Sequence, residues 1–327
     1  MLLTSYFLAA LAVVLAWPTP LALARAKWPA RAPVQAVLLW QAIALAGGLS
    51  MIGSMLVWGL SPLGDDLITA LGRGVKLVLG APDVPYPGIV HLFALSAAAL
   101  FGFHLVLTLI RATWRISRQR AKHRHLLGLL SNPAASGPDT LVLDHDTPVA
   151  YCVPGLNRSV TVLSQGLLDQ LTADEQRAVL AHERSHLDQR HDLLILAFTA
   201  WHEALPWLPT SKLALDAVRQ LVEMLADDRA LTQVTRPTLL RAIVAASSSA
   251  GSTPAKQQPS TTAGGQLANP LEGTPDGELS ARRIQRLLTA EPPLKRSAEA
   301  LIFVGTVLLL VCPTVLLIAP RLLDPNS

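Results

Sequence analysis

Four long stretches of the chain carry no acidic or basic side chain, and they constrain the fold more than any other feature. They are Leu2–Ala24, Val34–Leu60, Gly88–Ile110 and Ala300–Pro320, of which the third includes two histidines. Each is long enough to cross a hydrocarbon layer of about 30 Å as a helix. The whole chain is 51% hydrophobic and only 15% charged, a balance that excludes an ordinary soluble enzyme of this size. We therefore predict four transmembrane helices and a multi-pass protein of the cell membrane.

Basic residues in the connecting segments predict the orientation of these helices. The segment after the first helix holds three basic residues and no acid, whereas the segment after the second is mixed. The third helix is followed by a strongly basic run from Arg111 to Arg124, and Lys295 and Arg296 precede the fourth. Because Lys and Arg accumulate on the cytoplasmic side, residues 112–297 are expected in the cytoplasm and both termini outside it. The basic run then contacts the lipid bilayer, and no direct nucleic-acid partner is expected.

The first stretch has an alternative interpretation as a cleaved signal peptide that ends near Ala22-Leu-Ala24. It lacks the basic residues that open such a peptide, and three further hydrophobic stretches follow it. A retained first helix is therefore the favoured interpretation.

A five-residue motif carries the chemistry: His182-Glu183-Arg184-Ser185-His186, a His-Glu-x-x-His string. On a helix, His182 and His186 project from one face about one turn apart, so both imidazoles can bind one Zn²⁺. Glu183 lies beside them, where its carboxylate can act as general base toward water. The alternative is a surface helix that carries two histidines and a glutamate by chance.

The residues around the motif favour a helix. Thr172 and Glu175 have the spacing of a capping box, and neither Gly nor Pro interrupts residues 173–205. We therefore predict that the motif lies well inside a helix. The very apolar segment Asp192–Leu208 either continues that helix into the core or lies against the bilayer.

A third ligand is available in a second helical stretch, where Glu223 and Asp227 are four residues apart. Two histidines and Glu223 would provide three protein ligands and leave a fourth position open, as in catalytic zinc sites. Asp227 could accept the second ring N–H of His182 or His186 from outside the ligand set. The alternative is a solvated acidic face on which these carboxylates, with Asp228, pair with Arg219 or Arg229.

The remaining segments suggest an α+β domain between the third and fourth helices. A turn-rich linker, Asn132–Asp139, precedes three β-rich runs, Thr140–Leu143, Val149–Val153 and Val160–Leu163. The edge of such a sheet could receive an extended substrate peptide, or the strands could simply cover the motif helix. The expected divisions are 1–115 for three membrane helices, 116–246 for the catalytic domain, 247–278 for a flexible linker, 279–298 for an amphipathic helix, and 299–327 for the last membrane helix and a short tail.

Residues 149–192, with the strand runs and the zinc motif, resemble the BlaR/MecR family of integral-membrane zinc metallopeptidases. Glu223-Met-Leu-Ala-Asp227 resembles that family's Glu-x-x-Ala-Asp segment, and Leu279–Leu288 is similar to its Arg-rich helix before the last span. The resemblance implies a mainly α fold with a cytoplasmic gluzincin-type domain. It also implies an endopeptidase that cleaves a cytoplasmic protein in signalling, such as a BlaI/MecI-type transcriptional repressor, or cleaves itself. The β-lactam sensors of the family carry a penicillin-binding domain after the fourth span. Only Arg321–Ser327 follow here, so β-lactam sensing of that kind is not expected.

Two other functions stay open at this point. The HtpX/CAAX-protease group shares both motifs and removes membrane proteins in quality control, although its HtpX-type chains usually have two spans before the catalytic domain. A non-proteolytic membrane signalling protein could retain a vestigial zinc site, but such a site has no need for a base at Glu183. A peptidase also needs a donor for the developing oxyanion, and His191, His202 and Arg190 are the candidates.

Overall fold

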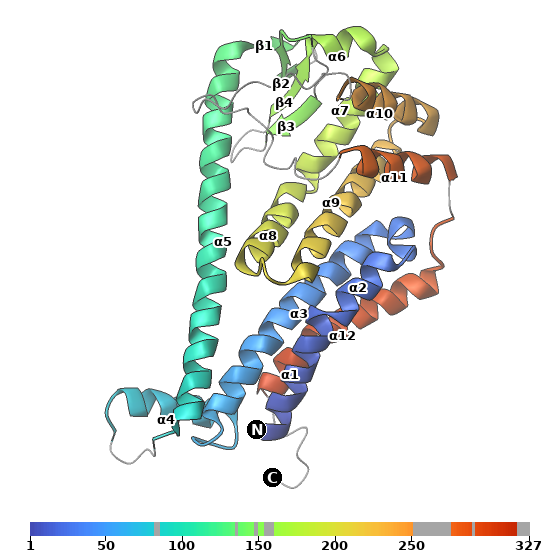
Figure 1. Cartoon of the computed structure of the whole chain (residues 1–327). Coiled ribbons are helices and arrows are strands. Elements are labelled where there is room, and N and C mark those ends of the chain that lie inside the picture. Colours follow the sequence, from blue (N-terminus) through green and yellow to red (C-terminus); the bar gives the residue numbers. More distant parts are fainter. Residues whose placement is uncertain are drawn as a thin grey trace. The chain divides into compact units, whose positions relative to one another are not determined.

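The computed structural model describes residues 1–81, 86–134, 137–146, 150–153, 160–250, 276–289 and 292–318. The chain divides into two compact units (Figure 1). The first comprises Met1–Ile110, Ala200–Ala217 and Pro293–Ser327, and the second comprises Arg111–Thr199 and Val218–Pro292. The expected flexible linker at 247–278 lies largely outside the described residues, although its first and last residues belong to helices.

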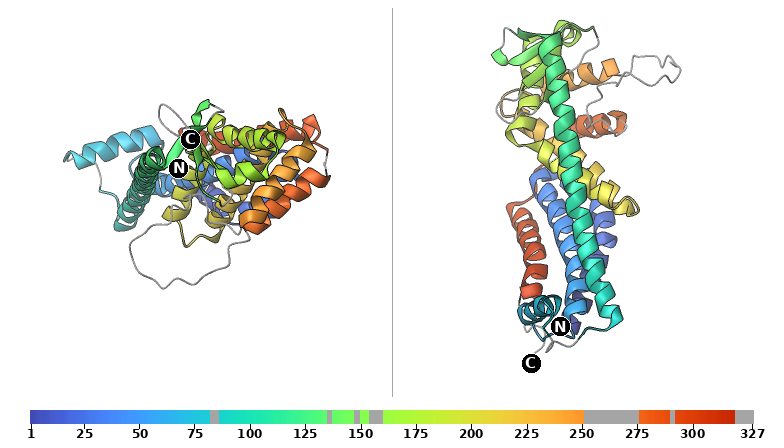
Figure 2. Two further views of the ribbon diagram at one scale, coloured as in Figure 1. Left: turned by 90° about the horizontal axis from the view of Figure 1, so that it is seen from above. Right: turned by 90° about the vertical axis from the view of Figure 1, so that its left-hand side faces the viewer.

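The first unit is built from long apolar helices. Its elements are α1 (Leu2–Ala16), α2 (Pro18–Arg25), a 3₁₀ turn (Trp28–Arg31), α3 (Pro33–Leu60), α4 (Leu67–Val78), the first half of α5 (Ile89–Leu130) and α12 (Arg296–Ile318). Helices α1, α3 and α12 lie side by side (Figure 1, Figure 2). Leu8, Val57 and Leu316 form a buried cluster in this unit.

Four segments are long and apolar enough to cross a membrane, as the sequence predicts: Leu2–Arg25, Pro33–Leu60, Ile89–Lys122 and Arg296–Ile318. Two of them differ in detail from the expectation. The first bends at Trp17, because Pro18 cannot continue the hydrogen bonding of α1 and disfavours helical backbone in the residue before it. The third continues past Ile110 to Lys122, within α5. Large apolar side chains such as Leu100 and Leu301 remain exposed on these helices, which suits contact with lipid.

Residues 200–217, which join α8 (His191–Ala204) to α9 (Pro209–Ala230), pack within the first unit. The indole of Trp201 lies against Gly48 of α3, where an added Cβ would meet it at 3.1 Å. His104 Nε2 of α5 lies 3.0 Å from the carbonyl oxygen of Ala204, and Thr210 donates to the carbonyl oxygen of Ala16. The α8–α9 turn therefore contacts three of the candidate spans.

The second unit opens with a four-stranded sheet: β1 (Ser131–Ala134), β2 (Gly137–Leu143), β3 (Ala150–Val153) and β4 (Val160–Ser164). The strand order is β1-β2-β4-β3, with β2 and β4 parallel and the outer pairs antiparallel. The three expected strand runs are confirmed. The expected linker at 132–139 is wrong, because β1 pairs with β2 and Pro133 is tolerated on this edge strand.

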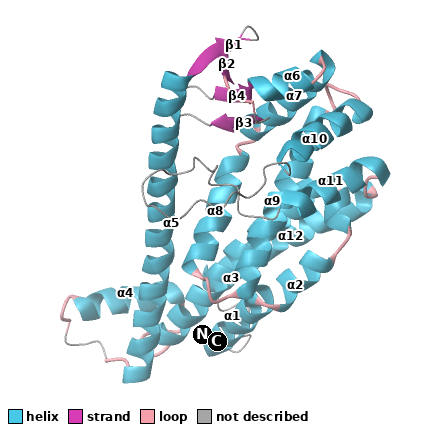
Figure 3. Ribbon diagram, turned by 45° about the horizontal axis from the view of Figure 1, so that its top comes forward, coloured by secondary structure: helices cyan, strands magenta, loops and turns pink. Residues whose placement is uncertain are grey.

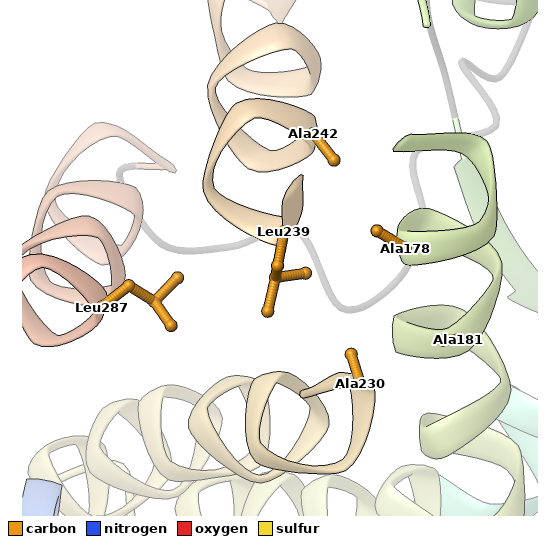
Figure 4. Close-up of a cluster of buried hydrophobic side chains, with 6 residues drawn as sticks. All are labelled: Ala178, Ala181, Ala230, Leu239, Ala242 and Leu287. Atoms are coloured by element: carbon orange, nitrogen blue, oxygen red, sulfur yellow. The ribbon is translucent and has the colours of Figure 1, made fainter. Parts of the chain in front are cut away.

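Helices α6 (Gln165–Gln170) and α7 (Ala173–Asp188) pack against this sheet (Figure 3). The other helices of the unit are the first part of α8, the second part of α9, α10 (Arg236–Ala250), which packs on α7, and α11 (Asp276–Thr289). The capping box of α7 is confirmed: the Thr172 hydroxyl accepts from the Glu175 amide, and the Glu175 carboxylate accepts from the Thr172 amide at 3.0 Å. Small residues let these helices approach closely, and Leu239 of α10 reaches into the middle of their shared core (Figure 4). The members are Ala178, Ala181, Ala230, Leu239, Ala242 and Leu287.

The motif lies on a helix, as predicted, but that helix does not continue to residue 205 although no Gly or Pro interrupts the range. Helix α7 ends at Asp188 and α8 begins at His191, with Arg190 between them at φ 49°. A residue in this left-handed conformation ends a helix, at a cost of about 1 kcal/mol for a side chain other than Gly. The zinc motif thus occupies the last turns of α7 rather than its middle.

Candidate metal centre

Three side chains from two helices converge in the second unit: His182 and His186 of α7 and Glu223 of α9. Their candidate ligand atoms all lie within 4.8 Å of one another. The Nε2 atoms of the two histidines are 3.3 Å apart. The Glu223 carboxylate oxygens lie 3.3 Å from Nε2 of His182 and 3.5 Å from Nε2 of His186.

This spacing fits a zinc ion. Ligands at about 2.0–2.1 Å from a tetrahedral zinc are about 3.3 Å from one another, since a tetrahedral edge is roughly 1.6 bond lengths. The two Nε2 atoms at 3.3 Å match that edge, and each has one of the two Glu223 oxygens at a similar distance, 3.3 Å for His182 and 3.5 Å for His186. Two imidazoles and one carboxylate are also a donor set that zinc prefers in catalytic sites. His182, His186 and Glu223 therefore form a zinc site.

Asp227 lies one turn after Glu223 on α9, and its side chain is 1% exposed. Its Oδ1 is 3.1 Å from Nδ1 of His182, the nitrogen that does not face Glu223. The alternative of a solvated acidic face fails for Asp227, because the residue is buried among groups of the metal centre. Asp228, in contrast, is 42% exposed and pairs with Arg286 at 2.8 Å.

Arg283 of α11 is the charged partner of both carboxylates. Its Nη2 and Nε atoms lie 2.7 and 3.0 Å from the two oxygens of Asp227, and its Nη1 lies 2.9 Å from Glu223 Oε2. Its guanidinium also comes within 3.4 Å of Nε2 of His182. The sequence predicts α11 as a basic amphipathic helix but assigns no role to this residue. The sequence feature that could have indicated a role for Arg283 is the spacing of Arg282, Arg283 and Arg286 on a helix otherwise rich in Leu.

The electrostatic environment leaves the carboxylates ionised. Burial raises the pKa of Glu223, but the charge of Arg283 and the hydrogen bond from His182 outweigh it and hold that pKa below its ordinary value. Burial likewise opposes the ionised form of Asp227, and the hydrogen bond from His182 and the charge of Arg283 lower its pKa. An ionised Glu223 is the form that can bind a cation.

The two histidines differ. Burial lowers the pKa of His186 to about 3, which keeps its ring neutral. Burial and the charge of Arg283 also lower the pKa of His182, but hydrogen bonds to Asp227 and Glu223 outweigh them and raise it to about 9. His182 must release that extra proton when it binds a metal, since only the neutral ring has a free lone pair.

Glu183 is half-buried and belongs to the same centre. Burial lowers the pKa of Arg283, but the charges of Glu223 and Asp227 hold it above its ordinary value. The charge of Glu183 adds to that effect, so its carboxylate lies within electrostatic range of the guanidinium.

The three candidate oxyanion donors differ in their surroundings. His191 is 1% exposed, with Nδ1 3.0 Å from Nδ1 of His186 and Nε2 3.0 Å from the Gln189 side-chain oxygen. His202 belongs to the first unit, where its Nδ1 lies 2.9 Å from Ser211 Oγ. Arg190 occupies the exposed turn between α7 and α8.

A His-Glu-x-x-His helix with a glutamate ligand from a second helix defines a zinc metallopeptidase. Residues 117–250, which include the whole ligand set and Asp227, match the family model of peptidase family M48. The segment that holds the metal centre thus matches this peptidase family, and the chain is a zinc metallopeptidase with four candidate membrane spans. Arg283 lies beyond the matched segment. No solved structure gives a significant match to the chain.

Proposed function

We propose that the protein is a membrane-embedded endopeptidase that cleaves a protein substrate at the cytoplasmic face of the membrane, in signalling. One observation carries this proposal: a three-ligand zinc site with an adjacent Glu183 lies in a chain that has four candidate spans. The basic run from Arg111 to Arg124 supports a cytoplasmic position for the catalytic domain.

The residues of the centre divide the chemistry among them. Zinc, when bound, polarises a peptide carbonyl and makes a water molecule more acidic. Glu183 accepts a proton from the attacking water and passes it to the leaving amine. Asp227 accepts the Nδ1–H of His182 and so keeps Nε2 of that ring directed at Glu223 and His186. Arg283 balances the charge of the two carboxylates.

The substrate class rests on the resemblance to the BlaR/MecR family. That resemblance favours a cytoplasmic repressor of the BlaI/MecI type, or self-cleavage. Strand β3 ends the sheet order β1-β2-β4-β3 and offers an edge to an extended peptide. Truncation of β3 with zinc content retained tests this: unchanged cleavage would remove the strand from substrate binding.

Quality control of membrane proteins, as in the HtpX/CAAX-protease group, is the second candidate. It is favoured by the packing of residues 200–217, a part of the M48 segment, against candidate spans. Part of the catalytic segment packs within the first unit, which holds the candidate spans. Such an enzyme is suited to substrates that lie in or on the bilayer. The two candidates differ in substrate, since one cuts a soluble repressor and the other a membrane protein.

The decisive comparison is wild type against Glu183→Gln, with Arg184→Gln as the matched control from the exposed side of the same helix. Each full-length protein is purified in lipid nanodiscs, assayed for zinc, and incubated with candidate repressors and membrane proteins. We expect equal zinc content in all three and cleavage by wild type and Arg184→Gln alone. Loss of general-base catalysis should slow cleavage by about 10²–10⁴-fold. If Glu183→Gln cleaves at the wild-type rate, the assignment of the base is wrong.

A further inference from the structure

The mechanism described above gives no role to His191, a buried titratable group. It is the first residue of α8 and is 1% exposed, although histidine at a helix start is normally solvated. Its imidazole lies nearly perpendicular to that of His186, with ring centroids 5.0 Å apart and planes at 82°. The Nδ1 atoms of the two rings are 3.0 Å apart.

The proton positions along this contact follow from the zinc site. His186 faces His182 and Glu223 with Nε2, so its neutral ring carries the proton on Nδ1. That N–H lies 3.0 Å from Nδ1 of His191, which must then be the acceptor. A neutral His191 consequently carries its proton on Nε2, and this nitrogen lies 3.0 Å from Oε1 of Gln189, an acceptor. Every atom in the series has a compatible donor or acceptor opposite it.

We propose that His191 is a positioning residue of the zinc site, a neutral imidazole acceptor that fixes the tautomer and ring orientation of His186. It is the counterpart of Asp227, which serves His182. The two ligand histidines are thus oriented by partners of different charge, a carboxylate for one and an uncharged ring for the other. A ligand histidine held by such a partner binds metal more tightly than one whose ring is free to rotate.

The local fold explains how His191 reaches this position. The left-handed backbone of Arg190 separates α7 from α8, and the first residue of α8 lies against the last turn of the zinc helix. The ion pair between Asp192 and Arg120 of α5, at 2.8 Å, fixes the start of α8 next to it. The residue with left-handed backbone thus lies between the two helices whose imidazole rings meet.

The absence of charge on His191, the partner of His186, limits the negative charge in the buried metal centre. Glu223, Asp227 and Glu183 already place three carboxylates near one Arg283. A fourth anion behind His186 would add like-charge repulsion in a buried site. A neutral acceptor orients the ring without adding charge.

The test compares two substitutions of equal size, His191→Asn and His191→Leu, in the full-length protein. Asn keeps an acceptor close to the position of Nδ1, and Leu removes it. His145→Leu, at an exposed histidine of the same unit, is the matched control. Zinc affinity is measured by competition with a chromophoric chelator, and the Co²⁺-substituted proteins are compared by their visible absorption spectra. These readouts do not require substrate, so the inference stands or fails independently of the proposed function.

We expect His191→Leu to weaken zinc binding by about 10–100-fold and to alter the Co²⁺ spectrum. His191→Asn should recover most of the affinity, and His145→Leu should match wild type. Equal zinc affinity in the Leu and Asn variants would overturn the proposal. Should the Leu variant fail to fold, ¹⁵N shifts of the histidine rings in the zinc-loaded wild type decide the matter. The proposal requires His186 protonated on Nδ1 and His191 on Nε2, and a His191 protonated on Nδ1 refutes it.

Discussion

Replacement of Arg283 by Met should strongly destabilise the zinc-free protein. The side chain is 14% exposed and makes three short contacts, two with Asp227 and one with Glu223. Met has a similar length and packs in the same space but removes the guanidinium from Asp227, which is 1% exposed and is left with its contact to His182. Removal of one partner from a buried ion pair costs about 3–5 kcal/mol. For a unit of this size that corresponds to a fall in melting temperature of about 10 °C.

Zinc should reduce this loss. The ion binds directly to Glu223 and interacts with Asp227 through His182, so its two positive charges compensate part of the charge that Arg283 balances. We therefore expect the Arg283→Met substitution to lower the melting temperature more in the chelated protein than in the zinc-loaded protein. The assay is thermal unfolding in nanodiscs, followed by circular dichroism with and without a saturating chelator.

The matched control is Arg286→Met, on the same helix less than one turn away. Its partner Asp228 is 42% exposed, and an exposed pair contributes about 0–1 kcal/mol. Its melting temperature should fall by no more than about 3 °C. Equal losses from Arg283→Met and Arg286→Met, or a loss unaffected by zinc, would refute the electrostatic reasoning. Asp227→Asn added to Arg283→Met should recover part of the stability, since both charges are then absent.

Three further predictions concern single sites. Glu223→Gln should weaken zinc binding by at least 10-fold in a chelator competition, since the anionic ligand is lost; wild-type affinity would exclude Glu223 as a ligand. The pKa of Glu175 is lowered by hydrogen bonds from the start of α7 and by Arg241. Its contribution to stability is therefore complete above its ordinary pKa of 4.5 and is lost as the pH falls toward the lower folded value. Glu175→Gln should flatten the pH dependence of unfolding below pH 4.5, and a variant with the wild-type profile would contradict this. Gly48→Leu should destabilise the first unit by about 1–3 kcal/mol through a clash with Trp201, measured as a lower melting temperature; wild-type stability would show that the indole can move aside.

Local patterns in the sequence were sufficient for much of the molecule. Uncharged stretches of at least 20 residues predict the four candidate spans, because only a helix satisfies its own backbone in lipid. The capping box at Thr172 and the four-residue spacings of His182 with His186, and of Glu223 with Asp227, depend on backbone geometry within one or two turns. Because these spacings are local, the sequence alone predicted the residues. It also predicted that Glu223 would meet the two histidines, since a catalytic zinc site needs a third protein ligand.

Only the tertiary structure revealed the groups that complete the site. Arg283 reaches the carboxylates from a helix about 60 residues further along the chain, and no periodicity predicts which arginine of α11 does so. The turn at Arg190 replaces a helix that the sequence pattern favours, because the burial of His191 and the ion pair of Asp192 offset the cost of a left-handed residue. The sequence by itself determined the zinc ligands, whose spacing follows from local helix geometry. The packing of α8, α9 and α11 decided the partners of those ligands, because such contacts depend on segments that meet only in the folded chain.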